Sequence, residues 1–337
     1  MSAASSSGAE PTHPAAVIFG CAGETLGAQE RRFFADADPL GFILFGRNCR
    51  EPRQVRDLVS ALRDAVGRDD APVLVDQEGG RVQRLGPPHW RRRAAWRSFG
   101  DMAAERGLDR AIETARIAAR DIAGELADLG IDVNCLPLLD VPAPQGHAII
   151  GDRAFSKDPD IVAALGRAVC EGLLSEGVIP VIKHIPGHGR ATVDSHLALP
   201  AVDAPGEALE ADFAPFRALR DMPWAMTAHV VYTAFDANAP ATASRTVVES
   251  AIRGSIGFAG LLVSDDLCMR ALTGGPGARA RAALDAGCDV VLHCNGDLAE
   301  MRETMRGTGP MSDRAMARFG NGVALARRAR LPVTAGD

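Results

Sequence analysis

Short runs of consecutive apolar residues recur along the chain, and a more polar stretch follows each of them. The runs are rich in Val, Ile and Leu, which is typical of parallel strands buried on both faces. We therefore expect eight buried strands within the ranges 14–23, 39–46, 72–77, 131–141, 178–187, 223–232, 260–267 and 289–295.

Between these runs, apolar residues are spaced three and four positions apart, as on one face of a helix. The clearest such segments are 51–67, 109–130, 158–177 and 246–257. Each segment ends at a glycine, the residue that most readily adopts the left-handed conformation after a helix. Asp158 begins one of these segments and is a favourable residue for capping a helix N-terminus.

Eight strands alternating with helices predict an α/β fold, a single-domain (β/α)8 TIM barrel. A doubly wound open sheet is the alternative. It is less favoured because the first strand-to-helix turn, GCAGETLG, lacks the G-x-G-x-x-G pattern of a dinucleotide site. No linker rich in Pro, Gly or Ser divides the chain. We expect a disordered tail over residues 1–13, one barrel over residues 14–330 and no second domain.

The composition supports a folded, globular chain. Its 337 residues are 47% hydrophobic and 24% charged, with a net charge of −6, which argues against disorder and against nucleic-acid binding. The seven cysteines occur without any C-x-x-C pattern, as expected of reduced thiols in the cytoplasm. We find no signal peptide and no apolar run long enough for a membrane span, so we expect a cytoplasmic protein.

Polar side chains stand at the carboxyl ends of the predicted strands, where barrel enzymes carry their active sites. Asp76 ends the third strand, Lys183 and His184 end the fifth, and Asp265 and Asp266 end the seventh. Several ionisable groups converging on one rim predict an active site. Successive strand residues face opposite sides, so only one of Asp265 and Asp266 can point into the barrel mouth. Alternation alone leaves open which one does.

Three of the eight histidines fall within residues 183–200, and two interpretations compete there. His184, His188 and His196 could bind a metal ion, but their spacing matches no compact zinc pattern. In the favoured interpretation, a mobile glycine-containing loop carries Asp194 and His196 as a pair. The Asp194 carboxylate would orient His196 and raise its pKa, which suits a general acid near neutral pH. We therefore expect no metal site.

Four motifs together resemble those of the bacterial β-N-acetylglucosaminidases of glycoside hydrolase family 3. More narrowly, they resemble the cytoplasmic branch that recycles peptidoglycan fragments. The motifs are VDQEGGRVQRL at 75–85, GDRAF at 151–155, KHIPGHG continuing to DSH at 183–196, and VSDDLCM at 263–269. They occur in the family's order and together span most of the chain.

The resemblance implies a retaining exo-β-N-acetylglucosaminidase that works without a metal or organic cofactor. The implied substrate is a muropeptide or a chitobiose-like sugar, namely N-acetylglucosamine linked to anhydro-N-acetylmuramic acid with or without a stem peptide. We expect a monomer that binds neither nucleic acid nor membranes. The alternatives are a phosphorylase on the same fold, a non-catalytic sugar-binding protein, and hydrolysis assisted by the substrate's acetamido group.

The family's residue roles transfer to the matching positions of this chain. The resemblance implies that Asp265 is the nucleophile, that His196 is the acid/base and that Asp194 orients His196. The implied sugar-binding residues are Asp76, Arg84, Arg153, Lys183 and His184. One departure is Ile185, because this branch usually has Phe there; we expect this to alter packing under the loop.

Overall fold

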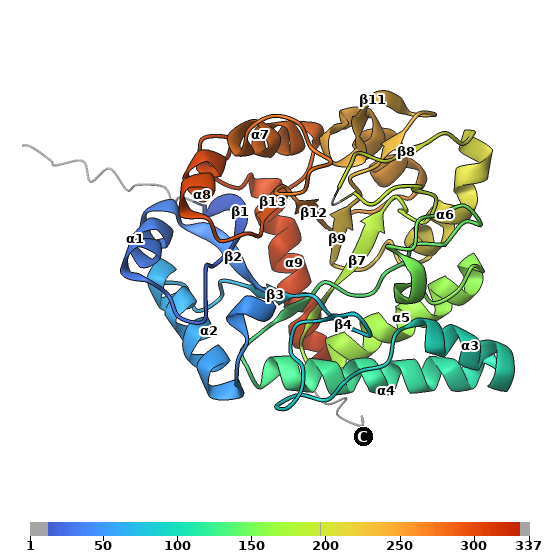
Figure 1. The fold of residues 1–337 in the computed structure, drawn as a ribbon, viewed down its shortest axis with the longest axis horizontal. Coiled ribbons are helices and arrows are strands. Elements are labelled where there is room, and N and C mark those ends of the chain that lie inside the picture. The colour runs from blue at the N-terminus through green and yellow to red at the C-terminus, as the bar shows by residue number, and fades with distance from the viewer. Residues whose placement is uncertain (1–12, 196, 331–337) are drawn as a thin grey trace, which may run out of the picture.

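The central feature of the computed structural model, which describes residues 13–195 and 197–330, is a closed barrel of eight parallel strands (Figure 1). Around the barrel, the strands follow the order β1, β13, β12, β9, β7, β6, β3, β2. They are β1 (Ala15–Gly20), β2 (Pro39–Leu44), β3 (Val73–Val75), β6 (Val133–Asn134), β7 (Ile179–Ile185), β9 (Trp224–Thr227), β12 (Leu261–Asp266) and β13 (Val290–His293). Each lies within one of the eight apolar runs, so the predicted (β/α)8 barrel is confirmed.

Helices surround the barrel, and α4 and α5 run side by side along one flank (Figure 1). The α-helices are α1 (Ala28–Ala37), α2 (Pro52–Val66), α3 (Arg97–Arg106), α4 (Leu108–Ala127), α5 (Pro159–Ser175), α6 (Gly206–Ala218), α7 (Pro276–Ala286), α8 (Leu298–Met305) and α9 (Asp313–Arg330). No helix of the described ranges has both the length and the hydropathy needed to cross a bilayer. The first twelve residues, where we expect a disordered tail, lie outside the described residues.

The predicted helix signals are largely confirmed. Asp158 caps α5, because its carboxylate accepts the Asp160 N–H at 2.9 Å. All four glycines that follow the predicted helices have positive φ; they are Gly67, Gly130, Gly177 and Gly257. The segment 246–257 differs from the expectation, because it forms a π-helix, η4 (Val247–Ser255). Apolar spacing of three and four residues does not distinguish a short π-helix from an α-helix.

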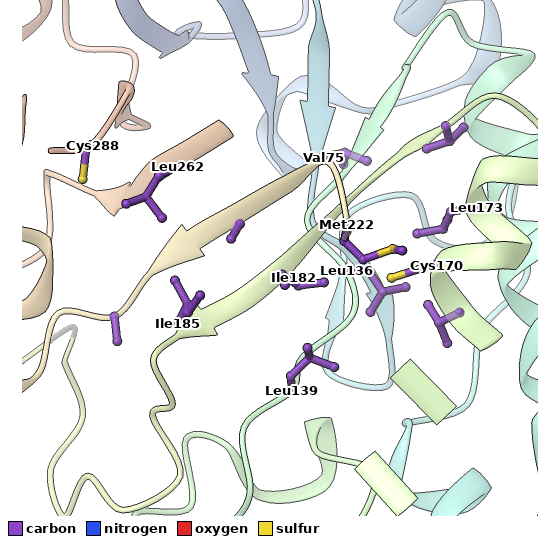
Figure 2. Packing of buried hydrophobic residues seen from close by; sticks show 14 of the residues in the cluster. Val75, Leu136, Leu139, Cys170, Leu173, Ile182, Ile185, Met222, Leu262 and Cys288 are labelled. Carbon is purple, nitrogen blue, oxygen red and sulfur yellow. The ribbon is translucent and has the colours of Figure 1, made fainter. Parts of the chain in front are cut away.

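Two apolar layers lie on either side of the barrel wall. Leu261 and Val263 of β12 belong to the inner cluster, whereas Leu262 packs in the outer cluster beneath the helices (Figure 2). The register of β12 against β13 shifts between Val263 and Asp266, so the alternation seen at Leu261 and Val263 does not extend to the two aspartates. Hydrogen bonds at the end of β12 distinguish them instead, because Asp266 Oδ1 accepts the N–H groups of Cys268 and Cys294.

The two ends of the barrel differ. Met311, Ala315 and Phe319 belong to the inner cluster together with residues at the starts of the strands, such as Trp224 and Leu261. Helix α9 therefore covers the amino-terminal mouth of the barrel. The carboxyl-terminal mouth stays accessible and is framed by short insertions. These are the hairpin of β4 (Gln77–Gly79) and β5 (Val82–Gln83), the sheet of β8 (Ala201–Val202), β10 (Val231–Tyr232) and β11 (Asp236–Pro240), and the 3-10 turns η1 (Gly46–Asn48), η2 (Gly151–Arg153) and η3 (Ala241–Ala243).

The barrel closes between its first strand and its last, since β1 pairs with β13 on one side and with β2 on the other. The segment before α9 reinforces this seam. Ala15 forms an antiparallel bridge with Pro310, and the Met311 N–H donates to the Pro14 carbonyl at 2.9 Å. Residues from both ends of the described chain thus hold the barrel shut.

Candidate active site

A pocket of about 260 Å³ opens at the carboxyl ends of the barrel strands. Pockets for drug-sized ligands occupy roughly 300–1,000 Å³, so this one suits a single sugar ring better than a long oligosaccharide. Six of the predicted site residues line it: Asp76, Arg84, Arg153, Lys183, His184 and Asp265. The three tryptophans that could have stacked on a sugar are instead buried in the core; they are Trp90, Trp96 and Trp224.

The floor of the pocket holds a buried network of opposite charges. The Lys183 ammonium lies 2.9 Å from Asp76 Oδ1 and 2.7 Å from Glu78 Oε1. Arg153 of η2 donates to both oxygens of Glu78, at 2.8 and 2.9 Å. The side chains of Lys183 and Glu78 are only 2% and 1% exposed. Each carboxylate therefore has at least one cation in direct contact, as burial of charge requires.

This network fixes the protonation states of its members. Burial alone would raise the pKa of Asp76, but Lys183 and Arg84 hold that pKa far below its ordinary value. Glu78 follows the same pattern, because Lys183 and Arg153 outweigh its burial. Burial would lower the pKa of Lys183, yet the two carboxylates raise it. Asp76 therefore stays ionised, and its remaining lone pairs can accept hydrogen bonds from sugar hydroxyls.

Arg84 and the aromatic ring of Phe45 form one side of the pocket. Arg84 donates from Nη2 to Asp76 Oδ2 at 3.2 Å, and its guanidinium carbon lies 5.2 Å from the centre of the Phe45 ring. Arg47 approaches the same ring at 5.0 Å. The cation–π contact restricts the rotamer of Arg84, so its guanidinium is pre-positioned at the pocket. Arg47 does not line the pocket, and its Nε donates to the Cys21 carbonyl at 3.0 Å.

Asp140 joins His184 to the loop that follows β7. Its Oδ1 accepts the backbone N–H groups of His184 and His188 at 3.2 and 2.6 Å, and its Oδ2 lies 2.7 Å from His184 Nδ1. Burial alone would raise the pKa of Asp140, but His184 and the His188 N–H lower it to about 2. One fully buried carboxylate thus sets both the ring orientation of His184 and the start of the loop.

We expect Asp140→Asn to destabilise the protein and to weaken substrate binding. The amide keeps one acceptor oxygen, so its NH2 group must face a donor that Asp140 now satisfies. Leaving buried donors unsatisfied costs about 1–3 kcal/mol. Urea unfolding would measure the loss in free energy, and KM would report the binding. The control is Asp101→Asn on the exposed side of α3, which should stay within about 0.5 kcal/mol of wild type. Equal stability of the two variants would contradict this role for Asp140.

The loop that carries the predicted acid/base is held at several points. The Tyr232 hydroxyl donates to the Gly187 carbonyl at 2.6 Å, and His188 Nε2 lies 3.1 Å from the Ser195 hydroxyl. A Cβ on Gly189 would stand 1.9 Å from the Val141 carbonyl oxygen. Gly189 is therefore needed for a close backbone approach, a physical reason different from the mobility that the sequence suggested.

A further contact on this loop pairs Arg190 with Asp212 of α6. Burial raises the pKa of Asp212 from 3.8 to about 6, although Arg190 opposes the shift. Between about pH 4 and pH 6 the unfolded chain has lost this proton while the folded chain retains it, so folding becomes less favourable as the pH rises. Compared with Asp212→Asn, the wild type should lose up to roughly 3 kcal/mol of unfolding free energy across that window. Urea unfolding of both proteins at several pH values would measure this loss. A difference in unfolding free energy that does not change with pH would contradict the raised pKa of Asp212.

Asp265 lies at the end of β12, half-buried in the pocket wall. Burial alone would raise the pKa of this carboxyl, but His229, His184 and the Asp266 N–H hold it below its ordinary value. The neighbouring Asp266 has a different task, because its Oδ1 accepts the backbone N–H groups of Cys268 and Cys294. Asp265 is therefore an ionised carboxylate available to a ligand, and Asp266 holds the loop behind it.

The predicted catalytic pair is only partly visible. His196 lies outside the described residues. Asp194 is half-buried on the loop, and its carbonyl accepts the N–H groups of Leu197 and Ala198. Ser195, between the two members of the pair, lines the pocket together with His188. Burial and the nearby His184 lower the pKa of His188 to about 4, so that ring is neutral at pH 7.

Sequence reasoning assigned no role in the site to Glu78 or Asp140, and it considered His188 only as one of three possible metal ligands. For Glu78 a signal was present, because it stands two positions after Asp76 and shares its face of an extended segment. Asp140 follows a strand that ends at Asn134, so strand periodicity does not reach it. The interactions of His188 depend on how the loop folds back, which no local pattern encodes.

Comparisons with known proteins agree with this geometry. Residues 26–317 match the family described as the glycosyl hydrolase family 3 N-terminal domain. The chain is 40% identical over 284 residues to a beta-hexosaminidase of Aromatoleum aromaticum, covering 83% of this chain and 79% of that protein. A beta-hexosaminidase of Xanthomonas oryzae pv. oryzae is 40% identical over 299 residues, with coverages of 86% and 87%. The structure of NagZ from Neisseria gonorrhoeae in complex with N-trifluoroacetyl-D-glucosamine aligns with a TM-score of 0.85 at 33% identity, covering 96% of this chain and 95% of that one.

Proposed function

Because the chain belongs to glycoside hydrolase family 3, we propose that it is a β-hexosaminidase that removes terminal, non-reducing β-linked N-acetylglucosamine from peptidoglycan fragments. The observation that carries the proposal is the ionised Asp265 at the barrel mouth, beside a pocket with room for about one sugar ring. The structural relative from Neisseria gonorrhoeae, whose ligand is an N-acylated glucosamine, supports the same class of substrate.

In the proposed reaction, the glycosidic bond is cleaved in two steps with retention. Asp265 attacks the anomeric carbon while His196 protonates the leaving oxygen, which yields a glycosyl-aspartate ester. The neutral imidazole of His196 then takes a proton from water, and the resulting hydroxide displaces Asp265. Asp194 orients His196 throughout. Each step conserves charge because the proton given to the leaving group is regained from water.

The remaining predicted residues bind and orient the sugar in this proposal. Asp76 accepts hydrogen bonds from ring hydroxyls, and Arg84 and His184 face the same pocket. Lys183 and Arg153 reach the pocket wall, but Lys183 already contacts both Asp76 and Glu78, and Arg153 donates from Nε and Nη2 to Glu78. We therefore assign these two cations mainly to holding the carboxylates in place.

Trapping the intermediate tests nucleophile, retention and substrate class together. A mechanism-based fluorinated N-acetylglucosaminyl fluoride should leave one sugar on the protein, and peptide mapping should place it on Asp265. The matched control is Asp265→Asn, which should remain unlabelled. An adduct on another residue would refute the assignment. Turnover without any adduct would favour assistance by the acetamido group, and binding without turnover would indicate a sugar-binding protein.

Product analysis separates hydrolysis from phosphorolysis. In phosphate buffer, a synthetic disaccharide of N-acetylglucosamine and anhydro-N-acetylmuramic acid should release free N-acetylglucosamine. Sugar 1-phosphate as the main product would establish the phosphorylase alternative instead. Cleavage of chitobiose but not of this disaccharide would refute the peptidoglycan assignment while leaving β-hexosaminidase activity intact.

The proposal includes a monomer that acts in the cytoplasm as one barrel over residues 14–330. Light scattering should then give a mass near 35.4 kDa. A mass of twice that value would contradict the monomer.

A further inference from the structure

We propose that Cys268, His293 and Glu300 form a binding site for a zinc ion, outside the pocket described above. Among the described residues, this is the cluster of His, Cys and acidic side chains whose ligand atoms converge, all within 4.8 Å of one another. It joins three elements: the loop after β12, the end of β13 and the first turn of α8.

His293 gives the strongest indication of a missing partner. Its side chain is 1% exposed, yet neither ring nitrogen has a hydrogen-bond partner in the described structure. Nε2 lies 3.4 Å from Glu300 Oε2, but without the alignment that a hydrogen bond requires. A buried imidazole without partners costs free energy, and a cation between these two groups would satisfy both.

The donor set suits zinc. Thiolate, imidazole and carboxylate bind Zn²⁺ at about 2.3, 2.0 and 2.0–2.2 Å, and the soft thiolate disfavours Mg²⁺ and Ca²⁺. Binding would displace the Cys268 thiol proton into solvent as the Zn–S bond forms. Glu300 is 47% exposed, which leaves a path for the ion and for a water molecule in the fourth position. Asn295 Nδ2 already holds Glu300 Oε2 at 2.6 Å, so this ligand is oriented in advance.

The position of the site suggests what the ion would do. Asp266 Oδ1 accepts the N–H groups of Cys268 and Cys294, the latter being the residue after His293. Zinc would therefore brace, from outside the barrel, the same two segments that Asp266 joins at the rim. Its place is structural, and the proposed reaction does not use it.

Metal titration of the full chain, freed of metal with EDTA, tests the proposal. Competition with a chromophoric chelator should show one equivalent of zinc. Co²⁺ should give the near-ultraviolet absorption of a thiolate–cobalt bond. Cys268→Ser should abolish this absorption, and His293→Gln should weaken zinc binding at least tenfold. Cys49→Ser, which removes a half-buried thiol outside the cluster, is the matched control and should bind like wild type.

Two outcomes would overturn the proposal: no zinc bound by the wild type, or binding and cobalt absorption unchanged in Cys268→Ser. If the wild type binds zinc but its cobalt form shows no thiolate–cobalt absorption, the ion lies elsewhere, for instance on the histidines of the pocket. That result would also refute the proposed site. If His293→Gln fails to fold in a urea titration, Cys268→Ser and Glu300→Gln still decide. None of these readouts depends on glycosidase activity, so the two proposals can fail separately.

Discussion

Asp265→Ala is expected to lower kcat for an aryl β-N-acetylglucosaminide by at least roughly a thousandfold. The substitution removes the atom that would attack the anomeric carbon, while Asp266 and its two backbone hydrogen bonds remain. Binding should suffer less than turnover, because the proposed sugar contacts of Asp76 and His184 are untouched. Steady-state kinetics would measure kcat and KM separately.

Azide distinguishes a missing nucleophile from a damaged site. The small anion fits the space that the carboxylate vacates, so it should restore part of the turnover of Asp265→Ala and yield an α-glycosyl azide. Asp285→Ala, on the exposed face of α7, is the control and should keep wild-type kinetics with or without azide. Near-normal activity of Asp265→Ala would show that another residue is the nucleophile.

Lys183→Met is expected to cost about 3–5 kcal/mol of unfolding free energy, in addition to most of the activity. Breaking a buried ion pair from one side leaves the other charge uncompensated. Here one ammonium serves two carboxylates, Asp76 and Glu78, which would be left to repel each other with one arginine each. Urea unfolding at pH 7 would measure the loss.

The chain offers a well-matched control for that change, because its only other lysine, Lys157, is exposed. Lys157→Met makes the same substitution and should stay within about 0.5 kcal/mol of wild type. Lys183→Arg keeps the charge but enlarges the head group, so we expect it to recover part of the stability and little activity. If Lys183→Met is as stable as the wild type, the stabilising contact of Lys183 with both Asp76 and Glu78 is refuted.

The fold could be predicted because burial on both faces of a parallel strand leaves a direct mark on the sequence. Each barrel strand lies in an apolar run for this reason, even β6, which is only two residues long. The π-helix η4 escaped prediction because its apolar face satisfies the same spacing as an α-helix.

Only those residues of the site that lie at the ends of barrel strands could be predicted from the sequence pattern. Asp76, Lys183 and Asp265 lie at strand ends, so the barrel brings them together independently of the conformation of the loops. Alternation could not choose between Asp265 and Asp266, because the register of β12 shifts before them; the choice required the hydrogen bonds of Asp266 to the N–H groups of Cys268 and Cys294. The contacts of Asp140 depend on loop paths, and the sharing of Lys183 between Asp76 and Glu78 depends on three-dimensional distances that periodicity does not contain.

The seam between β1 and β13 also has a consequence for biosynthesis. β1 is synthesised before its partner β13, which starts at Val290, and before the covering helix α9, which ends at Arg330. The barrel therefore cannot close until β13 has been synthesised, because β1 lacks one of its two neighbouring strands until then. Pairing across such a sequence distance also slows folding. A chain that stalls before β13 would leave that side of β1 unpaired, and unpaired apolar strands are sites that chaperones and proteases can bind.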